Sequence, residues 1–224
     1  MTGIWCVIPI KDLANAKTRL APALTPDERQ GLFRAMAEDV LDAAAGAKRL
    51  AGVLVLTNDA EAAVLARRYG ARVEREPANI GQSEAVALAA RLVMESGGEG
   101  VLTLPADAPL ATSAEIDGVL ARHPMTRPAM SIVPDHARRG SNCLVLTPGD
   151  VIPLHFGHVS FAPHLAEAEK AGIDANVFSE FPGIALDVDT PGDLAMALQT
   201  GRDSRAMRYA RDHGIAARLA SGPV

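Results

Sequence analysis

The chain has 224 residues, of which 48% are hydrophobic and 22% charged, with a formal net charge of −5. This size and composition suit one well-buried core, so we expect a single domain over residues 1–224. The negative charge argues against nucleic acid or an anionic membrane as a partner. Neither a signal peptide nor an apolar run of membrane-spanning length is present, which predicts a cytoplasmic protein.

Apolar runs typical of strands alternate with amphipathic segments typical of helices. The expected strands are 4–10, 53–57, 101–104, 129–133, 143–146 and 184–187. A first helix is expected to begin at the capping box formed by Thr25 and Glu28, and others cover 61–69, 84–96, 113–121 and 161–171, with a helical tail over about 201–220. This order predicts an α/β fold with a mostly parallel, mixed central sheet flanked by helices.

Three cations follow the first expected strand within nine residues. The strand ends in Pro9-Ile10-Lys11, and Lys17 and Arg19 come next. Open α/β sheets bind ligands at the carboxyl ends of their strands, and lysine and arginine together can hold a polyphosphate. Glycine-rich phosphate motifs are absent here, so side chains would form this nucleotide site. The alternative is a solvated basic loop.

The loop before helix 84–96 offers further contacts to a nucleotide. Gly81 lets a backbone approach a flat ring closely, and Asn79, Gln82 and Ser83 can bind base edges or ribose hydroxyls. The alternative is that Ser83 only caps the helix that follows.

Asp187 and Asp189 follow the last expected strand and lie two residues apart. Residues i and i+2 of a strand point to one face, so the two carboxylates would converge and suit Mg²⁺. Asp107, held between Pro105 and Pro109 at another strand end, could join them. The alternatives are a plain strand-to-helix turn rich in Asp, and a turn-forming Asp107. Thr190 is expected to be the N-cap of a helix whose first residue is Pro191.

Two segments could receive a small anion. Ser141 and Asn142 follow a pair of arginines, and Ser160 is expected to cap helix 161–171, whose amino terminus would attract a phosphate or carboxylate. The histidines His155, His158 and His164 nearby suggest zinc, but the candidate metal ligands are carboxylates and no Cys/His framework exists, so we do not favour it.

Together these segments resemble the 2-phospho-L-lactate guanylyltransferase family of coenzyme F420 biosynthesis (CofC, or FbiD in actinobacteria). The matching stretches are Ala16-Lys17-Thr18-Arg19-Leu20 for A-K-S-R-L, Ala106-Asp107-Ala108-Pro109-Leu110 for A-D-L-P-L, Gly140-Ser141-Asn142 for G-T-N, 156–164 for F-G-x-x-S-F-x-x-H, and 186–194 for L-D-I-D-T-P-x-D-L.

The resemblance implies a Rossmann-like nucleotidyltransferase fold related to the molybdopterin guanylyltransferases (MobA-like). It implies transfer from GTP to a phosphorylated three-carbon acid, namely 2-phospho-L-lactate, phosphoenolpyruvate or 3-phospho-D-glycerate, with release of pyrophosphate. From the residues and the resemblance together, the expected site contains Asp107, Asp187 and Asp189 for Mg²⁺ (or Mn²⁺), Pro9, Lys11, Lys17, Arg19, Asn79, Gly81 and Ser83 for the nucleotide, Ser141, Asn142, Gly157 and Ser160 for the acid, and Lys17, Arg19 and Asp107 as catalytic groups.

The loop Gly81-Gln82-Ser83 departs from the family's G-L-N. This departure keeps a cytidylyl- or uridylyltransferase open as an alternative, and a nucleotide-binding module without turnover is another. The family resemblance suggests a homodimer, for which the arginine-bearing tail is a candidate surface.

Overall fold

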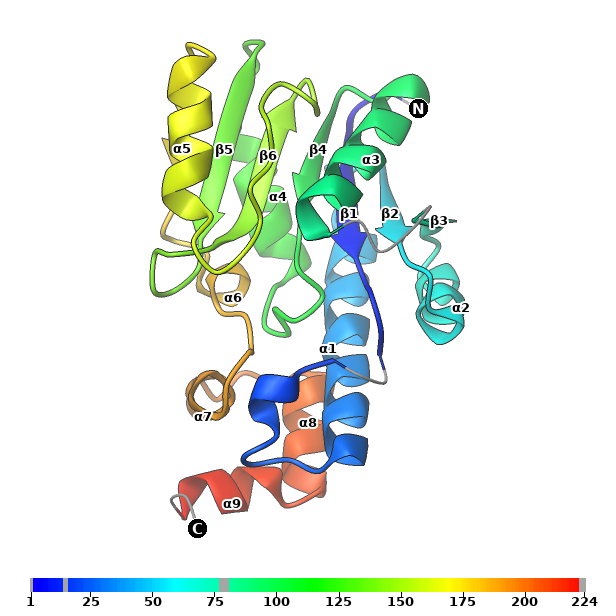
Figure 1. Cartoon of the computed structure of the whole chain (residues 1–224), viewed down its shortest axis with the longest axis vertical. Helices are drawn as coiled ribbons and strands as arrows, with labels where there is room; N and C mark the ends of the chain where they lie inside the picture. The colour runs from blue at the N-terminus through cyan, green and yellow to red at the C-terminus, as the bar shows by residue number, and fades with distance from the viewer. Residues whose placement is uncertain (1, 14–15, 77–80, 222–224) are drawn as a thin grey trace.

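The computed structural model describes residues 2–13, 16–76 and 81–221. These residues form a seven-stranded sheet in the order β3-β2-β1-β4-β6-β5-β7 (Figure 1). The strands are β1 (Ile4–Pro9), β2 (Gly52–Leu56), β3 (Arg72–Glu74), β4 (Gly100–Thr103), β5 (Ala129–Pro134), β6 (Ser141–Thr147) and β7 (Asn176–Val177). Strands β1 to β4 are parallel, and β6 runs antiparallel to its neighbours β4 and β5. The predicted mixed, mostly parallel sheet is confirmed.

Helices cover both faces of the sheet. They are η1 (Thr18–Leu20), α1 (Pro26–Gly46), α2 (Ala60–Arg68), α3 (Gln82–Glu95), α4 (Ser113–Arg122), α5 (Phe161–Lys170), α6 (Pro182–Ala185), α7 (Pro191–Gln199), α8 (Arg205–Asp212) and α9 (Ile215–Ala220). In Figure 1, α3 and α5 lie in front of the sheet, and α1 and α4 lie behind it. No helix in the described ranges is long and apolar enough to cross a membrane.

The central strands divide their side chains between two cores. In β1, Cys6 and Ile8 pack in the core on the α1 side, whereas Val7 packs in the core on the α3 side. In β2, Val55 and Leu56 divide in the same way. Because both faces of these parallel strands are buried, their sequences read as continuous apolar runs, which made them recognisable.

The predicted strand 184–187 is wrong. Ile184 lies in the short helix α6, and residues 186–189 form no strand. The segment is nevertheless extended over part of its length. Leu186 and Val188 are buried, and Asp187 and Asp189 line a cavity. A short apolar run, which here covers the end of a helix and the loop after it, therefore imitated a buried strand.

The carboxyl-terminal tail is helical, as predicted, but it forms two helices. Gly214 has a φ of 66° and separates α8 from α9. The lower half of α1 packs against α8 (Figure 1). Asp39 of α1 accepts the backbone N–H groups of Arg205 and Ala206, each at 2.9 Å, and so satisfies donors at the start of α8.

Candidate active site

The site lies at the carboxyl ends of β1 and β4. In the sheet, β2 and β4 flank β1 on opposite sides, so the chain order reverses there, and ligands bind outside such a switch point. Lys11 and residues 16–20 follow β1, and residues 104–110 follow β4. The Val188 N–H donates to the Asp107 carbonyl at 2.9 Å, which places Asp187 and Asp189 beside them.

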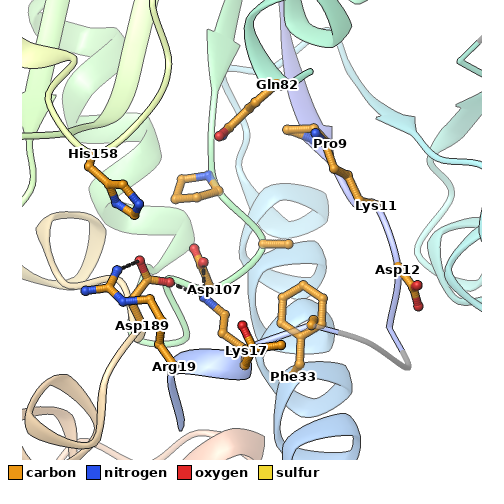
Figure 2. Close-up of a pocket in the computed structure, with 14 residues that line it drawn as sticks. Pro9, Lys11, Asp12, Lys17, Arg19, Phe33, Gln82, Asp107, His158 and Asp189 are labelled. Carbon is orange, nitrogen blue, oxygen red and sulfur yellow. Dashed lines mark hydrogen bonds and ion pairs between the residues drawn. The ribbon is translucent and has the colours of Figure 1, made fainter. Parts of the chain in front are cut away.

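Lys17 connects these segments. Its Nζ donates to Asp107 Oδ2 and, at 2.7 Å, to Asp189 Oδ1. Arg19 Nη1 donates to the other oxygen of Asp189 at 3.0 Å. The Lys17 side chain is only 6% exposed and lies over the ring of Phe33, with 5.7 Å from Nζ to the ring centroid. Figure 2 shows this cluster, with His158 and Gln82 across the cavity from it.

The charged side chains in this cluster shift one another's pKa values. Burial alone would lower the pKa of Lys17, but the charges of Asp107 and Asp189 outweigh it and raise that pKa. Burial would likewise raise the pKa of Asp189, but Lys17 and Arg19 outweigh it and lower that pKa. Lys17 is therefore a fixed cation and Asp189 a fixed anion near neutral pH.

Asp187 is held differently from Asp189. Its Oδ1 accepts a hydrogen bond from Asn142 Nδ2 at 3.0 Å, and no lysine or arginine contacts it within the described ranges. Burial, followed by the nearby charge of Asp107, raises its pKa to about 6. Asp187 is thus a carboxylate that lacks a balancing cation.

The donor set fits a divalent cation in its chemistry. Asp107 Oδ1 is buried and has no hydrogen-bond partner among the described residues, and Asp187 lacks a counter-charge. Carboxylate oxygens are the ligands that Mg²⁺ prefers. No group of three or more His, Cys, Asp or Glu side chains in the described ranges is arranged to hold a metal. Instead, the Lys17 ammonium lies between Asp107 and Asp189 and supplies the positive charge there.

The predicted nucleotide residues are only partly gathered. Pro9, Lys11, Lys17 and Arg19 line a cavity of about 430 Å³, together with Gln82. Gly81 precedes α3 with a φ of 97°, and Asn79 lies outside the described residues.

Ser83 does not cap α3, because the helix begins one residue earlier, at Gln82. Ser83 is also not among the residues that line this cavity. Its Oγ accepts the Phe156 N–H at 2.8 Å and so anchors the loop before α5.

The four predicted acid-binding residues line one cavity. Ser141, Asn142, Gly157 and Ser160 surround about 850 Å³ that also reaches Asp187. Ser160 stands at the N-cap position of α5, but its side chain does not cap the helix. Instead, its Oγ accepts the Ser141 N–H at 2.9 Å and joins the start of β6 to the start of α5. This cavity adjoins the nucleotide cavity, since Asp107 and Asp189 line both.

Two residues of the site were missed by sequence reasoning. The Phe33 ring lies beneath Lys17, and His136 lines the larger cavity. Nothing local in the sequence marks either residue as part of a site. Arg139, one of the two arginines expected near an anion, also lines the larger cavity.

The chain is similar to known proteins over most of its length. The family model "Guanylyl transferase CofC like" matches residues 4–224. A phosphoenolpyruvate guanylyltransferase of Conexibacter woesei is 38% identical over 190 residues, 85% of each chain. A 2-phospho-L-lactate guanylyltransferase of Methanothermobacter thermautotrophicus is 32% identical, covering 92% of this chain and 88% of its own.

Among solved structures, one from Desulfovibrio desulfuricans, described provisionally as a nucleotide-diphospho-sugar transferase, matches with a TM-score of 0.79. It is 16% identical and covers 99% of this chain and 98% of its own. At that identity the match shows the fold alone, which is a nucleotidyltransferase fold.

Proposed function

The chain belongs to the family of CofC-like guanylyl transferases, and on that premise we propose that it transfers the guanylyl group of GTP to a phosphorylated three-carbon acid. Pyrophosphate is the second product, and the reaction serves coenzyme F420 biosynthesis. The observation that supports this most is the meeting of two cavities at Asp107 and Asp189, one lined by Lys11, Lys17 and Arg19 and the other by hydroxyls and an amide.

The reaction needs positioning and charge neutralisation more than proton transfer. An oxygen of the acid's phosphate forms a bond to the α-phosphorus of GTP, and the bond from that phosphorus to the β-phosphate oxygen breaks. A phosphate dianion is already a nucleophile, so no general base is required. Lys11, Lys17 and Arg19 bind and orient the triphosphate and offset its negative charge.

Mg²⁺ is part of this proposal. Asp107, Asp187 and Asp189 would hold it, and when bound it would neutralise charge on the phosphates. The uncompensated Asp187 and the unpartnered Asp107 Oδ1 support a cation at this position. Lys17 now offsets two of these carboxylates, so this side chain would share them with the cation or turn toward the triphosphate.

We propose phosphoenolpyruvate as the first acid to test, because the more similar of the two curated relatives described above is named for it. The acid would lie against Ser141, Gly157 and Ser160. In this cavity the Arg139 guanidinium makes no hydrogen bond or ion pair with another described residue, so it is available to an anion.

The test is pyrophosphate release by the purified protein with Mg²⁺ and GTP. Phosphoenolpyruvate, 2-phospho-L-lactate and 3-phospho-D-glycerate are supplied in turn, and ATP, CTP and UTP replace GTP as controls. We expect release with GTP and phosphoenolpyruvate. Faster release with CTP or UTP would make the protein a different nucleotidyltransferase, and GTP binding without release on any acid would make it a binding module.

A further inference from the structure

His164 of α5 lies directly behind the acid cavity. Its side chain is fully buried, and both ring nitrogens have partners. Nδ1 lies 2.9 Å from Ser141 Oγ, and Nε2 lies 2.9 Å from the backbone nitrogen of His155. The imidazole therefore links the first residue of β6 to the loop that precedes α5.

These two contacts determine the tautomer of His164. The backbone N–H of His155 can only donate, so Nε2 must accept and carry no proton. In the neutral ring the proton then resides on Nδ1, which donates to Ser141 Oγ. Burial, with a smaller contribution from His155, lowers the pKa of His164 to about 4, which keeps the ring neutral near pH 7.

The tautomer in turn orients the Ser141 hydroxyl. A lone pair of Oγ is occupied by the Nδ1–H of His164, and the hydroxyl proton has no acceptor within the described part of the chain. Ser160 is in the same situation, since its Oγ accepts the Ser141 N–H. Both serines are buried and line the acid cavity, so two hydroxyl protons are available to a ligand that offers acceptors.

We propose that His164 is a positioning residue that makes Ser141 a hydrogen-bond donor to an oxygen of the acid substrate. This inference rests on the proposed function, because it assigns a role to a residue behind the acid site. Carboxylate and phosphate oxygens accept hydrogen bonds and do not donate, so a hydroxyl held in the donor orientation favours them. A ring in the other tautomer would compete with the acid for the Ser141 proton.

The competing explanation is that His164 only fills the core. The Phe156 ring packs edge-on against it, with centroids 5.0 Å apart, so the imidazole also supports the loop. Two amide variants separate these explanations, because each replaces one half of the ring. The amide of His164→Asn reaches the position of Nδ1 and can donate to Ser141. The amide of His164→Gln reaches the position of Nε2 and can only support the His155 N–H.

The measurements are the affinity for phosphoenolpyruvate by calorimetry and KM for each substrate in the pyrophosphate assay. We expect His164→Gln to weaken acid binding about tenfold, the factor for one hydrogen bond to a charged group, with KM for GTP within about twofold. His164→Asn should stay within about threefold of the unmodified protein for the acid. Circular dichroism and thermal unfolding verify that both variants fold.

Two further readouts keep the inference open to refutation. In the background of Ser141→Ala, adding His164→Gln should not weaken acid binding further, because the hydroxyl on which it acts is gone. Nitrogen-15 NMR of the unmodified protein should show the His164 proton on Nδ1, assigned by the signal that His164→Gln lacks.

The inference is overturned if His164→Gln weakens acid binding further in the Ser141→Ala background, or if the NMR spectrum shows the His164 proton on Nε2. Equal weakening by the Asn and Gln variants, or a smaller effect of Gln, overturns it as well. If the unmodified protein binds phosphoenolpyruvate without releasing pyrophosphate, the proposed reaction fails, and the same affinities and NMR spectra still decide the role of His164.

Discussion

Replacing Asp187 with Asn should make the protein more stable while it abolishes turnover. Asp187 has a pKa of about 6 in place of 3.8, mainly because it is buried and secondly because Asp107 is near. A pKa difference of about two corresponds to ~3 kcal/mol, which we reduce to about 2 kcal/mol because the carboxylate is partly exposed to solvent. The amide of Asp187→Asn has no charge to bury, and its oxygen can still accept the hydrogen bond of Asn142.

The effect should depend on pH with a defined sign. The folded-state pKa of Asp187 is raised, so the folded protein binds more protons than the unfolded chain between about pH 4 and 6. The unmodified protein therefore loses stability as pH rises through this interval, and the neutral variant does not. The gain from Asp187→Asn should be absent near pH 4 and complete by pH 8.

The assay is thermal unfolding of both proteins from pH 4 to 8, in a chelating buffer without divalent cations. At pH 8 the variant should melt about 4–8 °C higher, since 1 kcal/mol moves the melting temperature of a domain of this size by about 2–4 °C. The two melting temperatures should converge near pH 4. A difference that is independent of pH, or a less stable variant at pH 8, would refute the electrostatic explanation.

Three further predictions concern other parts of the molecule. Lys17→Met should lower the free energy of unfolding by about 3 kcal/mol, measured by urea denaturation in chelating buffer, because it leaves the carboxylates of Asp107 and Asp189 uncompensated in a partly buried site. Unchanged stability would show that solvent screens these charges. Arg139→Met should raise KM for the acid about tenfold and leave KM for GTP unchanged in steady-state kinetics, because its guanidinium lines only the acid cavity. Equal effects on both substrates would contradict that placement. Asp39→Ala should destabilise the protein by about 1–3 kcal/mol in the same denaturation, since it removes the acceptor of two backbone N–H groups at the start of α8, while kcat per folded molecule stays constant. A fall in kcat would instead connect the tail to the site.

Local features of this fold could be read from the sequence. The capping box at Thr25 and the N-cap at Thr190 begin α1 and α7 as predicted, because a cap and its helix are neighbours in the chain. The strands β1 and β2 were recognisable because both of their faces are buried. The incorrect strand at 184–187 came from the same rule, since Ile184, Ala185 and Leu186 form a short apolar run although Ile184 and Ala185 lie in the helix α6.

The pairing of side chains in the site was beyond sequence reasoning. The strand ends indicated that Lys17, Asp107 and Asp189 meet at one edge of the sheet, but not that Lys17 lies between the two carboxylates. Those contacts join residues 90 and 172 positions apart. Ser83 was a candidate for nucleotide binding because of its loop, yet Phe156, 73 positions away, occupies its Oγ. The partner of each polar side chain depends on which groups the tertiary fold brings within reach, and local sequence propensity does not determine this.

The unsatisfied polar groups of this site form two sets, hydrogen-bond acceptors on one side and hydrogen-bond donors on the other. On one side, Asp187 and Asp107 Oδ1 are acceptors without enough donors or positive charge. On the other side, the hydroxyls of Ser141 and Ser160 retain protons for which the described chain supplies no acceptor. Buried polar groups without partners cost stability, so an arrangement that leaves both kinds in one cavity is expected where a ligand completes it. A cation would satisfy the first set and a phosphorylated acid the second, and placing the two side by side brings the acid's phosphate next to the position proposed for the triphosphate.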